Sequence, residues 1–136
     1  MRILYKKSND ERCEDINKLI SNKFPKFLDE NKPELIIVPG GDGAMLHAIQ
    51  DINYYQVPFF GYGVGTLNFL MNEIPFNKLE EILTKLSKGE IKLHEVTTRK
   101  ISVNVESGKG KLKKIGEAAN EVVIGSTIMG SHSFAI

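Results

Sequence analysis

The sequence lacks the features of secreted and membrane-spanning proteins. Its 136 residues contain one cysteine, Cys13, and no tryptophan. A disulfide within the chain is therefore impossible, which fits a reducing compartment. The sequence has no run of about 20 apolar residues, the length that a membrane span needs. The apolar stretch Ile3–Tyr5 is too short for a signal peptide. We therefore expect a cytoplasmic protein with no membrane partner.

An excess of one charge is also missing. The chain has 18 lysines and arginines against 17 aspartates and glutamates, a net charge of +1. Nothing in this balance would attract nucleic acid or an anionic membrane surface. The densest basic stretch, Lys109 to Lys114, has Gly108 and Gly110 beside or within it, a pattern typical of a solvated turn. We expect no nucleic-acid partner.

The histidines do not form a metal-binding pattern. With a single cysteine in the chain, no structural zinc site is plausible, so we predict no metal-ligating side-chain cluster. His94 reads as part of an alternating strand. His47 follows Asp42 by five residues, where it could face a substrate or simply lie on the surface.

The first 90 residues alternate between strand and helix patterns. The apolar run Leu35–Val38, bounded by Pro33 and Pro39, is typical of a strand buried on both faces. Pro25 should end the first helix, and Gly89 should stop the last one; either Ser8 or Asp10 would cap the start of the first helix. Strands are predicted at 3–5, 35–38 and 58–60, and helices at 13–24, 44–50 and 75–88. Such alternation predicts an α/β fold with a parallel sheet.

The pattern changes after Gly89, where no helical period remains. Residues alternate between apolar and polar along 91–95 and 101–105, and 122–124 is β-branched. We therefore expect two domains, an α/β domain at 1–95 and the opening strands of an all-β domain at 96–136. About 45 residues of strand are too few for an independent sandwich. Either the chain is a fragment, or a partner covers the open edges of these strands. A second copy of the chain is the natural choice of partner.

The chemistry centres on the turn Gly40-Gly41-Asp42-Gly43, between a predicted strand and a predicted helix. Glycines let backbone N–H groups approach a phosphate closely, and the N-terminus of a helix attracts an anion. A carboxylate in that place can accept a proton from an attacking hydroxyl or help to hold Mg²⁺. The structural alternative is a tight turn with Asp42 as a helix cap.

A second glycine-rich segment, Gly61 to Gly65, is predicted to be a loop after the third strand. It lacks the dinucleotide fingerprint G-x-G-x-x-G, because position 66 is threonine. The chain also has no G-x-x-x-x-G-K-[ST] phosphate loop. The P-loop interpretation is therefore excluded, and the dehydrogenase interpretation is disfavoured.

Three segments together resemble NAD kinases in their residues, order and spacing: Gly40–Leu46, Gly61–Leu70 and Asn120–Ile124. The first motif alone is shared with phosphofructokinases and lipid kinases; the three together are far more specific. The resemblance covers the whole chain, which corresponds to the first half of a typical family member. It implies an enzyme that phosphorylates the 2′-hydroxyl of the adenosine ribose of NAD to give NADP, with ATP as donor and Mg²⁺ as cofactor.

The resemblance also implies roles for individual residues. Asp42 is the expected general base. The residues expected to bind the nucleotides are Gly40, Gly41, Gly43, His47, Phe69, Asn120 and Glu121. An amide beside a carboxylate, as in Asn120 and Glu121, offers both donors and acceptors to ribose hydroxyls and adenine nitrogens.

Two positions depart from the family pattern, which usually has asparagine at 63 and glycine at 68. This chain has Gly63 and Asn68. Asparagine tolerates a left-handed backbone, so the turn at 68 could survive, whereas Gly63 loses a polar side chain. Two other functions stay open: a truncated nucleotide-binding product without turnover, and a related kinase that acts on a sugar phosphate or a lipid.

Overall fold

The computed structural model describes residues 1–50, 56–97, 101–107, 110–118, 123–124 and 134–135. The chain divides into two compact units, Met1–Glu95 and Val96–Ile136. Within the described ranges, no helix combines the length and the apolar character needed to cross a membrane.

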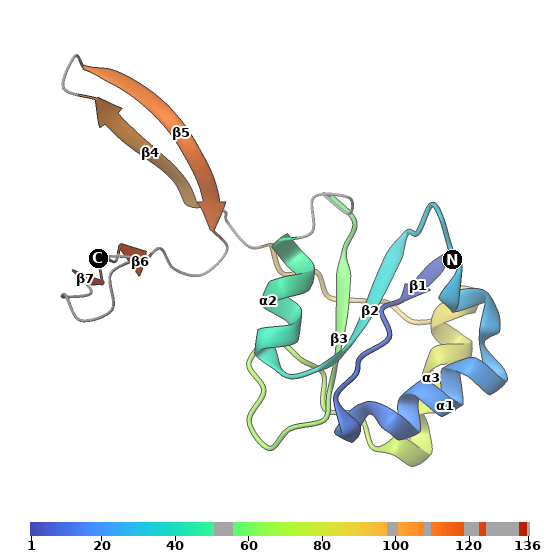
Figure 1. Ribbon diagram of the computed structural model, residues 1–136. Helices are drawn as coiled ribbons and strands as arrows, with labels where there is room; N and C mark the ends of the chain where they lie inside the picture. The colour runs from blue at the N-terminus through green and yellow to red at the C-terminus, as the bar shows by residue number, and fades with distance from the viewer. Residues whose placement is uncertain (51–55, 98–100, 108–109, 119–122, 125–133, 136) are drawn as a thin grey trace. The chain divides into compact units, whose positions relative to one another are not determined.

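The first unit is built on a sheet of three parallel strands (Figure 1). The strands are β1 (Ile3–Tyr5), β2 (Leu35–Gly40) and β3 (Phe59–Gly63), in the order β1-β2-β3. In the register, Leu4 pairs with Ile36, which pairs in turn with Phe59. Every residue of the central strand β2 is buried. The α/β fold and the strand buried on both faces are therefore confirmed.

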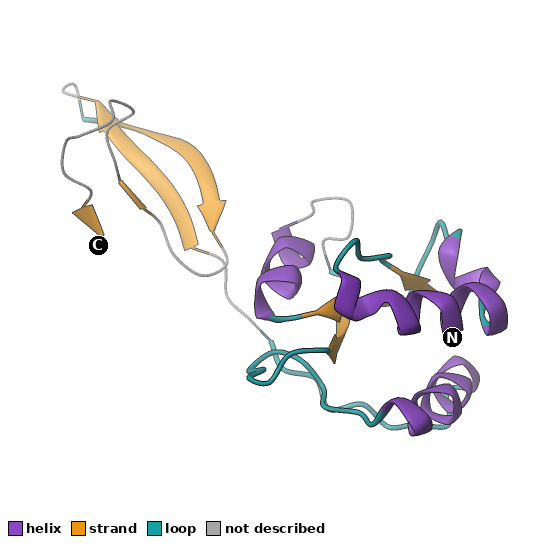
Figure 2. Cartoon of the chain, turned by 60° about the horizontal axis from the view of Figure 1, so that its bottom comes forward, coloured by secondary structure: helices purple, strands orange, loops and turns teal. Residues whose placement is uncertain are grey.

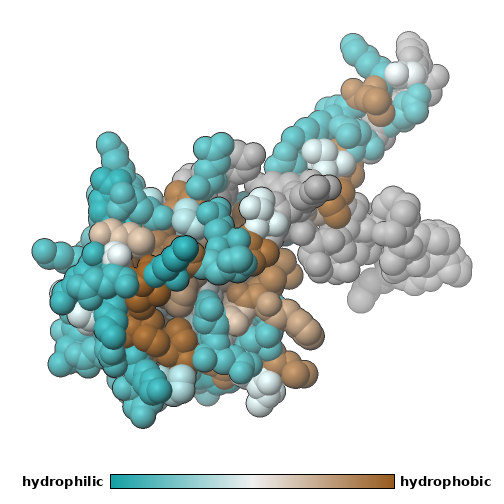
Figure 3. Space-filling model, turned by 180° about the vertical axis from the view of Figure 1, so that it is seen from behind, coloured by the Kyte–Doolittle hydropathy of each residue, from teal (hydrophilic) through white to brown (hydrophobic). Residues whose placement is uncertain are grey.

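Helices cover both faces of this sheet, as Figures 1 and 2 show. Alternate residues of β2 point to opposite faces, as the pleat of a strand requires. Helices α1 (Glu14–Lys23) and α3 (Phe76–Lys88) pack with Leu35 and Ile37, whereas α2 (Asp42–Gln50) packs with Ile36 and Val38. Some apolar side chains still reach the outside, among a mostly hydrophilic surface (Figure 3).

The helix ends follow from local residue chemistry. Asp10 caps a single 3₁₀ turn, η1 (Glu11–Cys13), because its carboxylate accepts a hydrogen bond of 3.0 Å from the Arg12 N–H. Helix α1 stops before Pro25, which begins a second 3₁₀ turn, η2 (Pro25–Leu28). Gly89 ends α3 in the left-handed region, with φ at 73°. Asp10 rather than Ser8 therefore caps the 3₁₀ turn that leads into α1, whereas Cys13, the N-cap of α1 itself, makes no side-chain capping bond. Both predicted stops are confirmed.

Three local predictions were wrong. Gly61 and Gly63 belong to β3, because they pair with Val38 and Gly40 of the neighbouring strand. The expected turn at 39–43 is a direct strand-to-helix junction, with Gly41 alone between β2 and α2. The expected strand at 91–95 is irregular, and His94 lies exposed within it. An alternating sequence forms a strand only where a neighbouring strand takes up its hydrogen bonds.

The described residues of the second unit form two antiparallel pairs of strands. Strand β4 (Ile101–Ser107) pairs with β5 (Lys111–Ala118), and the register shifts between Val103 and Asn104. Strands β6 (Val123–Ile124) and β7 (Phe134–Ala135) form the other pair. The β character predicted for this region is confirmed. The solvated turn predicted for the basic stretch was wrong from Lys111 onward, because Lys111–Lys114 are exposed residues of β5.

Candidate functional site

Asp42 lies where β2 passes into α2. Because the three strands are parallel, their carboxyl ends meet at one edge of the sheet, the usual location of ligand sites in α/β proteins. Gly40 ends β2 with φ at 139°, and a Cβ there would lie 2.8 Å from the Cβ of Ala44. Its carbonyl accepts a hydrogen bond of 3.1 Å from the Val64 N–H. Glycine at position 40 is therefore required by the fold itself.

The carboxylate of Asp42 is held by the loop that follows β3. The N–H of Phe69 donates to both carboxylate oxygens, at 3.1 and 3.0 Å. The N–H of Leu70 donates to Oδ1 at 2.9 Å. These bonds fix the position of the carboxylate, and charge-assisted bonds of this kind are stronger than neutral ones. The loop over 64–70, called here the Asp42 loop, thus forms one wall of the site.

Gly41 and Gly43 differ from Gly40, because the fold does not require them. Neither has a positive φ, and a Cβ added at either would meet no heavy atom within 4 Å. Gly43 even lies inside α2, where glycine costs up to about 1 kcal/mol relative to alanine. The open space beside both glycines is what close approach of a ligand to the backbone would need.

The N-terminus of α2 adds donors to this open space. The first N–H groups of a helix have no acceptor within it, and here the N–H groups of Ala44 and Met45 turn to the Gly41 carbonyl, at 3.0 and 3.3 Å. Asp42 and Gly43 come before them, at the start of the helix. This end of the helix also carries the positive end of its dipole. The arrangement suits an anionic group such as a phosphate.

The other predicted site residues are only partly gathered here. His47 is exposed on α2, one turn beyond Gly43 and on the same face of the helix. The ring of Phe69 is 88% exposed, so that its backbone, not its side chain, contacts Asp42. Asn120 and Glu121 lie outside the described residues. The structure therefore brings the glycine motif and Phe69 together, with His47 nearby.

Sequence reasoning missed the backbone of the Asp42 loop and its anchors. Asn72 holds the end of the loop, since its backbone N–H and its side-chain Nδ2 each donate to the Gly61 carbonyl at 2.9 Å. Leu70 contributes an N–H alone. Bonds made by backbone groups leave no signature in residue type, so no sequence signal pointed to Leu70. Phe69 and the departure at Asn68 were the two residues of this loop that sequence reasoning singled out.

A cation that the sequence did not indicate also lies near this loop. Arg12 forms an ion pair with Asp10, in which Nη2 of Arg12 lies 2.6 Å from Oδ2 of Asp10. Nη1 of Arg12 lies 3.9 Å from the position that a Cβ on Gly65 would take. The hydrogen bonds from Arg12 lower the pKa of Asp10 to about 2, so the pair stays charged at neutral pH. The guanidinium, paired with Asp10, thus lies close to Gly65 of the Asp42 loop.

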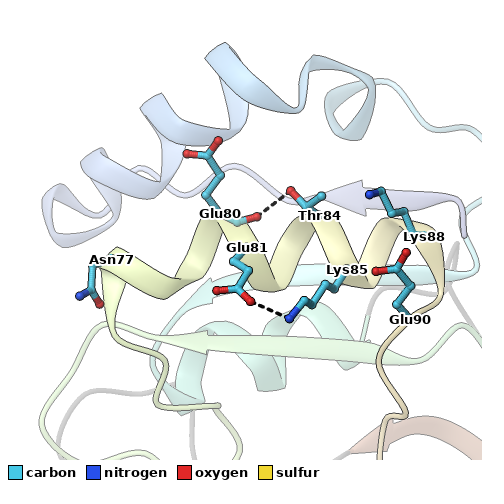
Figure 4. A pocket seen from close by; sticks show the side chains of 7 residues that line it. All are labelled: Asn77, Glu80, Glu81, Thr84, Lys85, Lys88 and Glu90. Atoms are coloured by element: carbon cyan, nitrogen blue, oxygen red, sulfur yellow. Dashed lines mark hydrogen bonds and ion pairs between the residues drawn. The ribbon is translucent and has the colours of Figure 1, made fainter.

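Among the residues that the structure describes, no three His, Cys, Asp or Glu side chains gather as a metal site. A separate hollow lies on the outer face of α3 (Figure 4). Charged side chains of that helix line it, with an ion pair between Glu81 and Lys85. None of the predicted site residues lines this hollow.

Comparison with known proteins places this site in a family. Residues 1–91, about two thirds of the chain, match the ATP-NAD kinase N-terminal domain. The NAD kinase of Rickettsia prowazekii is 30% identical over 124 residues, which cover 90% of this chain and 44% of that protein. The NAD kinase of Rickettsia typhi is 37% identical over 79 residues, or 57% of this chain and 29% of that protein.

A shorter match joins the chain to the NAD kinase of Rickettsia canadensis, with 40% identity over 57 residues. This match covers 42% of the chain and 22% of that relative. The chain thus spans less than half the length of these curated relatives. The resemblance seen in the sequence is confirmed over the unit that carries Asp42. On the match of residues 1–91, the chain belongs to the ATP-NAD kinase family.

Proposed function

We propose that this protein transfers the γ-phosphoryl group of ATP to the 2′-hydroxyl of the adenosine ribose of NAD, giving NADP. The observation that carries the proposal is the position of Asp42. Its carboxylate is fixed by two backbone N–H groups, next to a helix N-terminus and two glycines that face open space. Family membership supplies the class of reaction.

In the proposed reaction Asp42 is the general base. The ribose oxygen forms a bond to the γ-phosphorus while the bond from that phosphorus to the β–γ bridging oxygen breaks, and ADP leaves. The proton of the hydroxyl passes to the carboxylate. The Phe69 and Leu70 N–H groups keep the carboxylate in place, so that positioning lowers the barrier without any movement of the base.

The glycine motif is the proposed phosphate site. Gly40 shapes the strand-to-helix junction, while Gly41 and Gly43 leave room for phosphate oxygens against the N–H groups of α2. Arg12 lies beside Gly65 in the same region, where its guanidinium is paired with Asp10. A bound phosphate would compete with the Asp10 carboxylate for this guanidinium.

The remaining predicted residues are proposed to hold NAD. His47 and the exposed ring of Phe69 would contact the nucleotide, because aromatic and imidazole rings suit an adenine face. Asn120 and Glu121 would bind ribose hydroxyls and adenine nitrogens. We assign 1–95 as the nucleotide-binding catalytic domain and 96–136 as the opening strands of an NAD-binding β domain.

Mg²⁺ fits this site only as a partner of ATP. It prefers one or two carboxylates together with substrate phosphates, and Asp42 is the carboxylate at the motif. Oδ1 already accepts two N–H groups and Oδ2 accepts one, so a free lone pair remains on Oδ2. That lone pair is the one that the proposed base uses, so the phosphates of ATP would hold the ion and no protein ligand is assigned. When bound, the ion would neutralise charge on the phosphates.

Three further proposals concern setting and partners. The single cysteine supports a cytoplasmic location, and the balanced charge argues against a nucleic-acid partner. The exposed apolar side chains of the second unit, Ile101, Leu112 and Ile115, support a homo-oligomer. The small molecules bound would be ATP and NAD.

The test is NADP formation by the purified protein from ATP, Mg²⁺ and NAD. Asp42→Asn should lower kcat by about 100-fold or more, the usual contribution of a positioned base. Asp29→Asn, the same change at an exposed carboxylate of the same unit, should leave kcat unchanged. Equal rates for the wild type and Asp42→Asn would exclude Asp42 as the base. Phosphorylation of a sugar phosphate or a lipid in place of NAD would favour the related kinases, and binding without turnover would favour a non-catalytic product.

A further inference from the structure

Gly63 and Asn68 lie directly against each other. A Cβ added to Gly63 would stand 2.8 Å from Nδ2 and 2.9 Å from Cγ of Asn68, closer than carbon atoms approach in proteins. The side-chain amide of Asn68 therefore occupies the space that a side chain at position 63 would fill. The two positions at which the sequence departs from the family pattern are thus one contact in the structure.

The Asn68 amide also holds the loop in which it lies. Its Nδ2 donates to the Gly65 carbonyl at 3.0 Å, which closes a tight turn over four residues. Its Oδ1 is shielded from solvent and has no hydrogen-bond partner. The bond that Nδ2 donates fixes the orientation of the amide over Gly63. This makes the amide a specific packing element.

The next two residues of the chain connect this contact to the carboxylate. Phe69 and Leu70 follow Asn68 directly, and their N–H groups reach Asp42. The path of the chain at Asn68 sets the direction of those N–H groups, because the peptide units are consecutive and planar. A change at 63 or 68 should therefore alter the contact with Asp42.

We propose that Asn68 is a positioning residue for Asp42: its amide, seated on Gly63 and bonded to Gly65, sets the Asp42 loop so that the Phe69 and Leu70 N–H groups reach the carboxylate. A Cβ at position 63 would displace the amide, because the amide lies where that Cβ would stand. The catalytic consequence rests on the proposed function. The structural link between Gly63, Asn68 and the Asp42 loop does not depend on the proposed function.

The test is amide hydrogen exchange of Phe69 and Leu70 in the whole protein, followed by NMR. Asn68→Ala removes the bond to Gly65, and exchange of both amides should rise roughly 2- to 10-fold, the range given by one lost hydrogen bond. Asn68→Asp keeps the shape but cannot donate, so it should act in the same direction. Thr66→Ala, an exposed change in the same loop, is the matched control and should leave both rates unchanged.

Gly63→Ala provides the decisive comparison. In the wild type it should displace the amide and raise both exchange rates, as Asn68→Ala does. In the Asn68→Ala background the space is empty, so the same change should add little. An equal effect of Gly63→Ala in both backgrounds would overturn the proposal, as would exchange in Asn68→Ala no faster than in Thr66→Ala.

Two further readouts separate this proposal from general unfolding and from the proposed function. The Ile36 N–H, bonded to the Pro58 carbonyl at 3.0 Å in the core, serves as an internal reference. A rise at Ile36 equal to that at Phe69 would mean global destabilisation and would overturn the positioning role. Where NADP forms, kcat should fall with the loop contact, and KM for NAD should rise with it, because Phe69 lies in the same loop. The predicted exchange pattern without any turnover would uphold this inference and defeat the proposed kinase activity.

Discussion

The central strand of the first unit and the hairpin of the second show how differently similar residues are used. Every residue of β2 is buried, whereas most of β5 is exposed. Both strands carry isoleucine: Ile37 is 0% exposed and Ile115 is 59% exposed. The difference lies in the covering elements, because helices pack on both faces of β2. Burial is therefore set by the neighbours that a strand has, more than by its own residues.

The candidate site residues are likewise shared between the packed first unit and the second unit. The glycine motif and the Asp42 loop belong to the well-packed first unit, within the range that matches the family domain. Asn120 and Glu121 belong by sequence to the second unit. A packed core can hold a carboxylate to within a fraction of an ångström, which a positioned base needs. We therefore expect the chemistry to depend on the first unit and nucleotide affinity to depend also on the second.

The largest effect should come from a matched pair of core and surface substitutions. Ile37→Ala leaves a cavity in the first unit and should lower the free energy of unfolding by about 2–5 kcal/mol. Ile115→Ala in β5 should change it by less than about 0.5 kcal/mol. Urea unfolding of both variants measures the difference. A comparable loss from both would mean that Ile115 is buried in the protein in solution, as the homo-oligomer predicts.

A smaller effect should come from glycine substitutions in the two units. Gly40→Ala forces a side chain into a backbone with φ at 139° and against the Cβ of Ala44. We expect a loss of about 1–3 kcal/mol, typical of one strained residue. Gly116→Ala in β5 is the control, because a Cβ there meets no heavy atom within 4 Å. Thermal unfolding should separate the two, and equal melting temperatures would show that the strand-to-helix junction adapts without strain.

The smallest effect on stability should come from Gly43→Ala, which should nevertheless have a large effect on ATP binding. Gly43→Ala replaces a helical glycine that faces open space, so the free energy of unfolding should rise by up to about 1 kcal/mol. If a phosphate lies against this backbone, the same change should weaken ATP binding, measured by calorimetry, by about tenfold or more. Gly116→Ala again serves as the control. A stabilised variant with unchanged affinity would remove Gly43 from the phosphate site.

Much of the fold of the first unit could be predicted from the sequence. The prolines and Gly89 marked the ends of helices, and the run Leu35–Val38 marked the buried strand, because these signals act over a few residues. The prediction failed at Gly61 and Gly63, where glycines suggested a loop but pairing with β2 made a strand. It failed again at Lys111–Lys114, where the charges suggested a turn but pairing with β4 produced a strand. Tertiary pairing decided both segments.

The candidate site was predictable only in part. Asp42 and its glycines stand together in the sequence and carry a recognisable pattern. The groups that hold the carboxylate come from residues 27 and 28 positions further along the chain, and they are backbone N–H groups. No residue type marks such a contact, so it becomes visible only when the path of the chain is known. The packing of Asn68 on Gly63 likewise depends on the loop turning back on itself.

The contact between Asp42 and the loop also bears on the order in which the protein folds. The contact joins residues far apart in the chain. The entropy lost when the segment between Asp42 and Phe69 is closed must therefore be overcome before the bonds can form. Strands β2 and β3 have to be aligned first, because β3 leads into the Asp42 loop. We therefore expect the carboxylate to be captured late, after the core has condensed. A newly made chain would therefore form its core before the Asp42 carboxylate is held in place.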